Sequence, residues 1–340
     1  MRWWQRRWPG RWGLCWTLLF CMTSALASQL VHVRPRLATP PAASTPAIPA
    51  AAAGSVNYDH PLSVNVNEVL VPVLITDPLD RPVIGLDAQQ FQIFEDKVPQ
   101  RITSFTVDEA PVSIGILFDL SSSMSDKIRR SRQALQQFMR TANPQDEFFL
   151  IEFADQPHLV TGFTSDVEQM QDRIEVAQPH GRTSLLDAIY FGLAEMRQAR
   201  YRRRALLIIS DGGDNHSRYT EREVRNAVRE SDVQLFAIGI FSPLSARYSP
   251  EEESGPALLG DLAETSGGRE FSVDDVSELP DVATRIAIVL RSQYLLGYTP
   301  KNATRDGKWR KIKVKLDPPP GLPRLTVAAR AGYYAPGFPK

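Results

Sequence analysis

Residues 112–124 read VSIGILFDLSSSM, and this segment indicates much of the architecture around it. Its first half, Val112 to Phe118, is a nearly unbroken apolar run, which is typical of a strand buried on both faces of a parallel sheet. A polar loop begins at Asp119 and leads into an amphipathic helical stretch from about Met124 to Arg140. A buried strand joined to a helix by a short polar loop is the opening of a crossover unit, so parallel strands are expected.

The same alternation of strand and helix patterns continues along the chain. Three further apolar runs look like buried strands, and amphipathic stretches of helical period lie between and after them. This order predicts an α/β domain at residues 111–292, with an open, doubly wound, mostly parallel sheet and helices on both faces. The expected strands span residues 148–153, 205–209 and 233–240, and the expected helices span residues 167–177, 185–200, 221–230, 257–265 and 276–291.

Shorter strand patterns flank this domain on both sides. Before it, residues 64–110 carry alternating apolar positions, interrupted by turn residues between Asp77 and Pro82. After it, residues 293–337 carry strand candidates separated by Asp-Gly and Pro-Pro-Pro-Gly turns. Each β module would be marginal alone, because a small sheet needs a second layer to cover its apolar face. We therefore expect the two modules to pair into one β-sandwich, with the α/β domain inserted between them.

The N-terminal region has the layout of an export signal followed by a tether. Arginines precede an apolar run from Leu14 to Met22, and Ala25 and Ala27 are small residues at the positions that a signal peptidase recognises. We expect a signal peptide at residues 1–27, cleaved after Ala27; the alternative is an uncleaved N-terminal membrane anchor. Residues 28–63, rich in proline and alanine, are expected to form an extended linker. The protein is thus predicted to be secreted, periplasmic or attached to the cell envelope.

The composition argues against several classes of function. The chain has 39 lysine and arginine residues against 39 aspartate and glutamate residues, a balance that argues against a nucleic-acid partner. Both cysteines, Cys15 and Cys21, lie in the predicted signal, so no disulfide framework is expected in the exported chain. No His-x-x-x-His spacing occurs, which argues against zinc. Beyond the signal, no apolar stretch has the length of a transmembrane helix.

Oxygen-bearing residues gather where the predicted strands end, and ligands of an open parallel sheet bind at that edge. Oxygen donors without cysteine or histidine select a hard divalent cation, so Mg²⁺ is expected, with Mn²⁺ and Ca²⁺ as alternatives. Largely neutral ligands would leave the ion positively charged with a free coordination position, which favours an Asp or Glu side chain of a partner protein. The candidate ligands are Asp119, Ser121 and Ser123 after the first strand, Thr183 in the loop before the helix at residues 185–200, and Asp211 just beyond the strand at residues 205–209.

At these positions the sequence resembles the von Willebrand factor A domain. The resemblance rests on the motif Asp-x-Ser-x-Ser at Asp119, Ser121 and Ser123, followed in order by Thr183 and Asp211. It covers over half the chain and implies a metal-ion-dependent adhesion site. In that family the serines and the threonine or second aspartate coordinate the metal, partly through water, and an acidic partner side chain completes the shell. Three flanking segments also look like those of secreted bacterial proteins related to von Willebrand A domains: Phe91 to Asp96, Tyr294 to Tyr298 and Arg330 to Tyr334.

Simpler structural roles stay open for the same residues. Asp119 and the two serines could form the N-cap of the following helix, and Thr183 could cap the helix that starts near Leu185. Asp187 is interpreted as an acidic residue favoured in the first turn of that helix. Asp214 is either a hydrogen-bond acceptor behind the site or a turn residue, and the turn role is preferred.

Three functions are compatible with the site. The leading hypothesis is an exported, metal-dependent adhesion or scaffold module that is not an enzyme. A second is a structural envelope module whose metal serves stability alone. A third is a metal-assisted phosphoryl hydrolase, in which a strand-end aspartate attacks phosphorus. Against the hydrolase, Ser121 stands where a second carboxylate is usually needed, and no lysine is evident beside the site.

Overall fold

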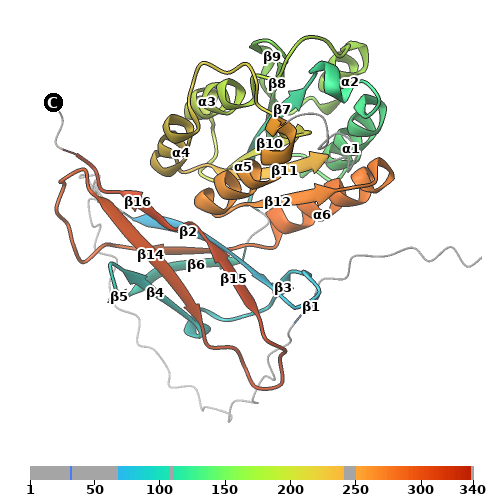
Figure 1. Ribbon diagram of the computed structural model, residues 1–340. Helices are drawn as coiled ribbons and strands as arrows, with labels where there is room; N and C mark the ends of the chain where they lie inside the picture. The colour runs from blue at the N-terminus through green and yellow to red at the C-terminus, as the bar shows by residue number, and fades with distance from the viewer. Residues whose placement is uncertain (1–30, 33–67, 108–109, 241–249, 338–340) are drawn as a thin grey trace, which may run out of the picture.

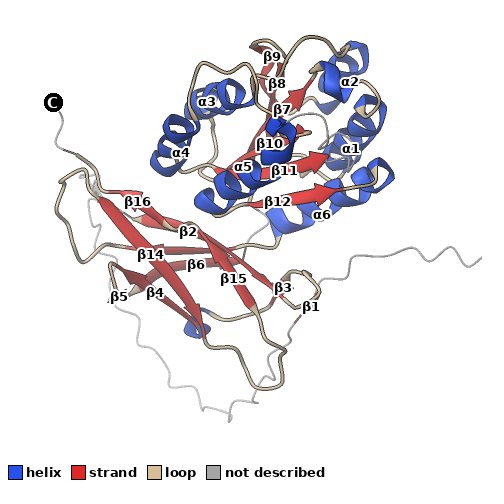
Figure 2. Cartoon of the chain, in the orientation of Figure 1, coloured by secondary structure: helices blue, strands red, loops and turns tan. Residues whose placement is uncertain are grey.

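The structure of the protein is a computed structural model that describes residues 31–32, 68–107, 110–240 and 250–337. The predicted signal peptide and nearly all of the predicted linker lie outside these ranges. The described chain forms a sheet covered by helices and, below it in Figure 1, a layered pair of antiparallel sheets. Figure 2 shows the contrast between the two parts: the α-helices surround the upper sheet, and the lower part is built almost entirely of strands.

The upper part is built on a six-stranded sheet in which all neighbouring strands are parallel except the last pair. Every residue of its β7 strand is buried, because helices cover both faces of the sheet. Gly115 in this strand allows the ring of Phe149 to approach, since an added Cβ atom would lie 2.1 Å from that ring. Across the sheet the order is β12 (Arg269–Val273), β11 (Gln234–Ile240), β10 (Arg204–Ser210), β7 (Ser113–Asp119), β8 (Glu147–Phe153) and β9 (Pro157–Thr164).

Helices pack on both faces of this sheet, each through its own hydrophobic core. Alternate residues of β7 feed the two cores: Ile116 and Phe118 point into one and Leu117 into the other. The doubly wound, mostly parallel α/β fold predicted from the sequence is therefore confirmed. On one face lie α1 (Ile128–Arg140), α2 (Val167–Val176) and α6 (Leu279–Arg291), and on the other lie α3 (Leu185–Glu195), α4 (Glu221–Glu230) and α5 (Pro250–Ser266).

Both edge strands of the sheet were missing from the sequence prediction. Strand β9 pairs on one side only and carries exposed and partly exposed residues along its whole length, so its apolar pattern is weak. Strand β12, at the opposite edge, is short and contains charged residues. The structure also starts α1 at Ile128 rather than near Met124. Among the described residues, no helix combines the length and apolarity needed to cross a membrane.

The lower part consists of two four-stranded antiparallel sheets that share one hydrophobic core. Each sheet combines strands that precede the α/β domain with strands that follow it, as expected for paired flanks. A short parallel pair, β1 (Val31–His32) with β3 (Val83–Ile84), lies beside them. The first sheet has the order β15 (Thr326–Ala329), β2 (Val69–Thr76), β13 (Tyr294–Tyr298) and β6 (Ile102–Val107), and the second has the order β16 (Gly332–Tyr334), β14 (Trp309–Leu316), β4 (Phe91–Glu95) and β5 (Val98–Gln100).

A buried polar cluster connects the two sheets inside this core. The Oε2 atom of Glu95 accepts hydrogen bonds from the hydroxyls of Tyr298 at 2.8 Å and Tyr333 at 2.9 Å. Burial and the bond to this carboxylate raise the pKa of both tyrosines, so their hydroxyls stay protonated and remain donors. Glu95 precedes the α/β domain in sequence and both tyrosines follow it, so the cluster also joins the two flanks.

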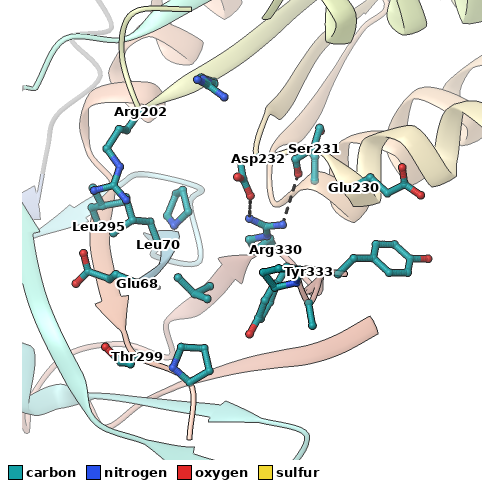
Figure 3. A pocket seen from close by; sticks show the side chains of 18 of the residues that line it. Glu68, Leu70, Arg202, Glu230, Ser231, Asp232, Leu295, Thr299, Arg330 and Tyr333 are labelled. Atoms are coloured by element: carbon teal, nitrogen blue, oxygen red, sulfur yellow. Dashed lines mark hydrogen bonds and ion pairs between the residues drawn. The ribbon is translucent and has the colours of Figure 1, made fainter. Parts of the chain in front are cut away.

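The two parts of the molecule meet around a cavity of about 490 Å³. Figure 3 shows Arg330 at its edge, reaching from the β-sandwich to the α/β domain. Its guanidinium donates to the Asp232 carboxylate at 2.5 Å and to the carbonyl of Ser231 at 3.5 Å. Both acceptors lie between α4 and β11, so one arginine attaches the sandwich to the end of the sheet opposite the predicted site.

Candidate metal centre

The first candidate ligand, Asp119, ends strand β7 and is fully buried. Its Oδ1 atom accepts a hydrogen bond from the backbone N–H of Ser121 at 2.8 Å, and its Oδ2 atom accepts one from the hydroxyl of Ser210 at 2.5 Å. Ser210 is the last residue of β10, the strand beside β7. The carboxylate is therefore fixed between two neighbouring strand ends.

The loop after β7 turns tightly and keeps two hydroxyls together. Ser122 to Met124 form one turn of 3-10 helix, in which the N–H of Met124 donates to the carbonyl of Ser121 at 3.0 Å. The hydroxyl oxygens of Ser121 and Ser123 lie 3.0 Å apart. Ser121 is buried and Ser123 is partly exposed, so the pair extends from the interior to the solvent.

The helix-cap interpretation of these residues does not hold. Helix α1 starts after Lys127, and neither Lys127 nor Ser121, which precedes the 3-10 turn, forms a side-chain cap hydrogen bond. The N-cap position of α3 is held by Ser184, not by Thr183, and it also lacks such a bond. The oxygen atoms of the serine loop are thus not needed to cap a helix.

The loop that carries Thr183 is bound to the serine loop on one side. The carbonyl of Gly181 accepts from the N–H of Ser122 at 3.1 Å, and the N–H of His180 donates to the carbonyl of Leu120 at 2.7 Å. Gly181 has a φ of +67°, and a Cβ atom there would lie 2.6 Å from the carboxylate of Asp155. A glycine is required for this turn, which brings Thr183 to the end of the sheet.

The same loop is bound to the segment after β10 on its other side. The carbonyl of Thr183 accepts from the backbone N–H groups of Asn215 and His216, both at 3.1 Å. The side-chain oxygen of Asn215 accepts from the N–H of Thr183 at 3.0 Å. Thr183 is 3% exposed. These bonds place it in one rim with Asp119 and Asp211, formed by the loops at the carboxyl ends of the strands.

The last candidate, Asp211, is bonded through only one of its two oxygen atoms. Its Oδ2 atom accepts a hydrogen bond from the Nζ atom of Lys127 at 2.9 Å, and this ion pair is buried. Its Oδ1 atom is buried and has no hydrogen-bond partner among the residues that the structure describes. An unpaired carboxylate oxygen in the interior is costly, so a ligand at this position would be strongly favoured.

Repulsion between the buried carboxylates of Asp119 and Asp211 also favours the binding of a positive charge at the rim. Burial, followed by repulsion from Asp211, raises the pKa of Asp119 to about 7, although bonds from Ser210 and Ser121 oppose the shift. In the metal-free centre, Asp119 therefore takes up a proton as the pH falls below about 7. A divalent ion bound between the loops would supply the missing charge and keep both carboxylates ionised.

The donor set suits a hard divalent cation. The rim offers carboxylate and hydroxyl oxygens, one carboxylate oxygen is unpaired, and the two serine hydroxyls are adjacent. Within the described residues, no group of three or more histidine, cysteine, aspartate and glutamate side chains could hold a metal, so a site at this rim depends on hydroxyl ligands. Magnesium and manganese accept such oxygen ligands together with water.

Sequence reasoning missed two polar contacts in this region. It expected no lysine beside the site, and Lys127 bonds to Asp211; its place just before α1, at the same rim, was the available signal. For Asp214 it preferred a turn role over the alternative of a hydrogen-bond acceptor behind the site. The Asp214 carboxylate instead accepts hydrogen bonds from the hydroxyl of Ser217 at 2.6 Å and from the N–H of Leu186 at 3.4 Å, and thereby holds the start of α3.

The sequence of this part of the chain matches a known family. The sequence model of the von Willebrand factor type A domain family matches residues 114–213, a range that includes all five candidate ligands. The chain carries a von Willebrand factor type A domain. The match extends from strand β7 to the loop after β10, so it contains the three loops that meet at the rim of this von Willebrand A domain.

Two curated proteins are similar in sequence. An uncharacterised protein of Borreliella burgdorferi is 23% identical over 188 residues, which cover 49% of this chain and 55% of that protein. The human inter-alpha-trypsin inhibitor heavy chain H4 is 24% identical over 216 residues, which cover 58% of this chain and 22% of that protein. The chain thus spans about half the length of the first relative and about a fifth of the second.

Solved structures with similarity to the chain include bacterial and animal proteins. A BatB protein from Bacteroides thetaiotaomicron is 17% identical, with 53% of this chain and all of that chain covered and a TM-score of 0.43. The von Willebrand domain of the type V pilus tip protein Mfa5 from Porphyromonas gingivalis is 12% identical, with 52% and 94% covered and a TM-score of 0.42. Proximal thread matrix protein 1 from the mussel byssus, solved with a zinc-occupied adhesion-site motif, is 18% identical, with 58% and 49% covered and a TM-score of 0.45.

Proposed function

We propose that the von Willebrand A domain of this chain is an exported module that binds another protein through a divalent cation. Its ligands are Asp119, Ser121, Ser123, Thr183 and Asp211, acting directly or through water. When bound, the cation supplies a Lewis-acidic position that accepts an Asp or Glu side chain of the partner.

The observation that carries this proposal is the unpaired Oδ1 atom of Asp211. It is a buried carboxylate oxygen at a rim where Asp119 is also buried and where Ser121 and Ser123 place two hydroxyls together. Each feature is costly or neutral for the folded protein alone, and all of them become favourable once a hard cation is present.

Mg²⁺ is the cation that we propose, with Mn²⁺ or Ca²⁺ as alternatives. Mg²⁺ prefers about six oxygen ligands and usually keeps several waters, so these donors, some of which act through water, leave at least one position free. Ser123 is partly exposed, which gives an external carboxylate access to that position. A purely structural metal, the second hypothesis, would have no use for such an opening.

The phosphoryl hydrolase remains a weaker alternative. Lys127 removes one of the arguments against it, because a lysine does lie beside the site. Its ammonium, however, is bound to Asp211 and its side chain is only 7% exposed, so it is not available to a substrate. Ser121 also still stands where such enzymes need a second carboxylate. A binding role therefore fits the residues better than a catalytic one.

We further propose the arrangement that exports the module, as a secreted, periplasmic or envelope-attached protein. Residues 1–27 direct export, with cleavage after Ala27, and residues 28–63 form a tether. The paired flanks at residues 64–110 and 293–337 then form a base for the α/β domain at residues 111–292. The partner is a protein outside the cytoplasm rather than a nucleic acid.

A calorimetric titration of metal-free protein with Mg²⁺ tests the centre. We expect one ion to bind to the wild type. Asp119→Ala should weaken binding by about 100-fold or more, because loss of a ligand exceeds the 10- to 100-fold effect that is typical of residues one shell further out. Asp126→Ala is the matched control: Asp126 lies close by in sequence, is exposed, and should leave the affinity unchanged. Equal Mg²⁺ uptake by Asp119→Ala and the wild type would reject the site.

Capture from the native envelope tests the partner. Immobilised wild-type protein should retain a partner in Mg²⁺ and release it when EDTA is added, whereas Ser123→Ala should retain little in either buffer. A partner that is retained equally with EDTA and by Ser123→Ala would contradict adhesion through the metal, even if the titration had found a bound ion.

A further inference from the structure

Lys127 is a buried cation within the candidate metal centre, and neither the sequence motif nor the proposed ligand set gives it a role. Its Nζ atom donates to Oδ2 of Asp211 at 2.9 Å, and the side chains of the lysine and the aspartate are 7% and 3% exposed. Burying an ammonium group is expensive, so its presence at this rim requires an explanation.

The backbone holds Lys127 firmly in place. Its N–H donates to the carbonyl of Met124, in the turn that carries the serine hydroxyls, at 2.9 Å. Its carbonyl accepts from the N–H groups of Arg130 and Ser131, both at 3.0 Å, and from the Ser131 hydroxyl at 3.1 Å. These bonds fix the backbone of Lys127 between the serine loop and the first turn of α1, and its side chain reaches Asp211 from there.

We propose that Lys127 sets the charge of the loaded centre and so makes the bound metal selective for an anionic partner. This inference rests on the proposed function. Asp119 and Asp211 carry two negative charges, and Lys127 offsets one of them. A divalent cation then leaves the centre with one net positive charge, whereas the same centre without the lysine would be neutral when loaded.

A net positive centre attracts a carboxylate, and it completes its charge balance when one carboxylate binds. The lysine must also repel the metal itself, because like charges in a buried setting interact strongly. The two effects have opposite signs: removing the positive charge strengthens metal binding and weakens the binding of an anion to the metal. If Lys127 served only to hold the loop, its substitution would change the metal affinity and the carboxylate affinity in the same direction.

The test compares Lys127→Met, Lys127→Gln and wild-type protein in two measurements. Mg²⁺ affinity is measured by calorimetry. Carboxylate binding is then measured on the Mn²⁺-loaded protein by water-proton relaxation, with acetate as the probe, because a carboxylate that binds to the ion displaces a water from it. Both variants should bind Mg²⁺ more tightly and acetate more weakly than the wild type, each by about fivefold or more, the size expected for one nearby charge.

Two controls separate charge from structure. Lys127→Arg keeps the charge and should stay close to the wild type in both measurements. Arg129→Met removes an exposed charge from the same turn and should change neither. Gln retains a hydrogen-bond donor for Asp211, so Lys127→Gln provides the comparison if Lys127→Met does not fold.

The outcomes are distinct from those of the proposed function. If the wild type binds no Mg²⁺, both the function and this inference are wrong. If the wild type binds Mg²⁺ and acetate but the neutral variants match it, the metal centre stands and the role of Lys127 is rejected. Weaker binding of both Mg²⁺ and acetate in Lys127→Met and Lys127→Gln would also reject the proposed role of Lys127. That result would mean that the lysine has a structural role only.

Discussion

Asp211→Ala is expected to lower the free energy of unfolding of the metal-free protein by about 3 to 5 kcal/mol, the range found when one partner of a buried ion pair is removed. The reason is Lys127, whose ammonium is buried and bonds to Asp211. Without the aspartate it would remain in the interior as an unpaired charge. Urea denaturation in EDTA measures the loss.

A double substitution shows whether the unpaired charge causes that loss. Asp211→Ala combined with Lys127→Met removes both charges, and we expect it to recover most of the stability lost by Asp211→Ala alone. If the double variant is as unstable as Asp211→Ala, the destabilisation comes from the loop itself and the buried ion pair has little influence. The exposed neighbour Asp126 provides the control, since Asp126→Ala should change stability little.

Glu95→Ala should strongly destabilise the β-sandwich. The buried hydroxyl of Tyr298 and the partly buried hydroxyl of Tyr333 would lose their acceptor. Each unsatisfied group costs about 1 to 3 kcal/mol, so a loss of about 3 kcal/mol or more is expected. Urea denaturation monitored by far-ultraviolet circular dichroism gives the value.

Glu95→Gln is the matched control for this cluster. Its amide oxygen can still accept from both hydroxyls, so it should cost much less than Glu95→Ala. A Glu95→Ala protein within about 0.5 kcal/mol of the wild type, the size of a surface substitution, would show that the two sheets do not depend on this connection. The same result would show that the pairing of the flanks before and after the α/β domain does not depend on Glu95.

The architecture could be predicted where periodicity and burial agree. The apolar run from Val112 to Phe118 became β7, buried along its length, and the alternation that follows it predicted parallel strands and helices on both faces. The edge strands β9 and β12 were not predicted from the sequence, because a strand that pairs on one side only needs fewer apolar residues. Helix starts were also inaccurate, since a 3-10 turn precedes α1 and carries part of its pattern.

The gathering of Asp119, Thr183 and Asp211 at one rim was predictable, because chain order and strand topology bring their loops together before any side chain is positioned. Their role as metal ligands stays a prediction. The motif could not reveal what holds them there. Ser210 bonds to Asp119 and Lys127 bonds to Asp211, and neither contact is specified by the Asp-x-Ser-x-Ser motif. Such contacts join residues that are far apart in the sequence. The spacing of residues in a single sequence does not show which distant side chains will touch.

The most direct measurement of the central claim is the anomalous diffraction of Mn²⁺ in crystals of the protein grown with that ion. We predict a single strong peak at the rim, within bonding distance of the hydroxyl oxygens of Ser121 and Ser123 and beside Asp119 and Asp211, with at least one water among its ligands. A map without a peak between the three loops, at Mn²⁺ concentrations that saturate the calorimetric titration, would contradict the account.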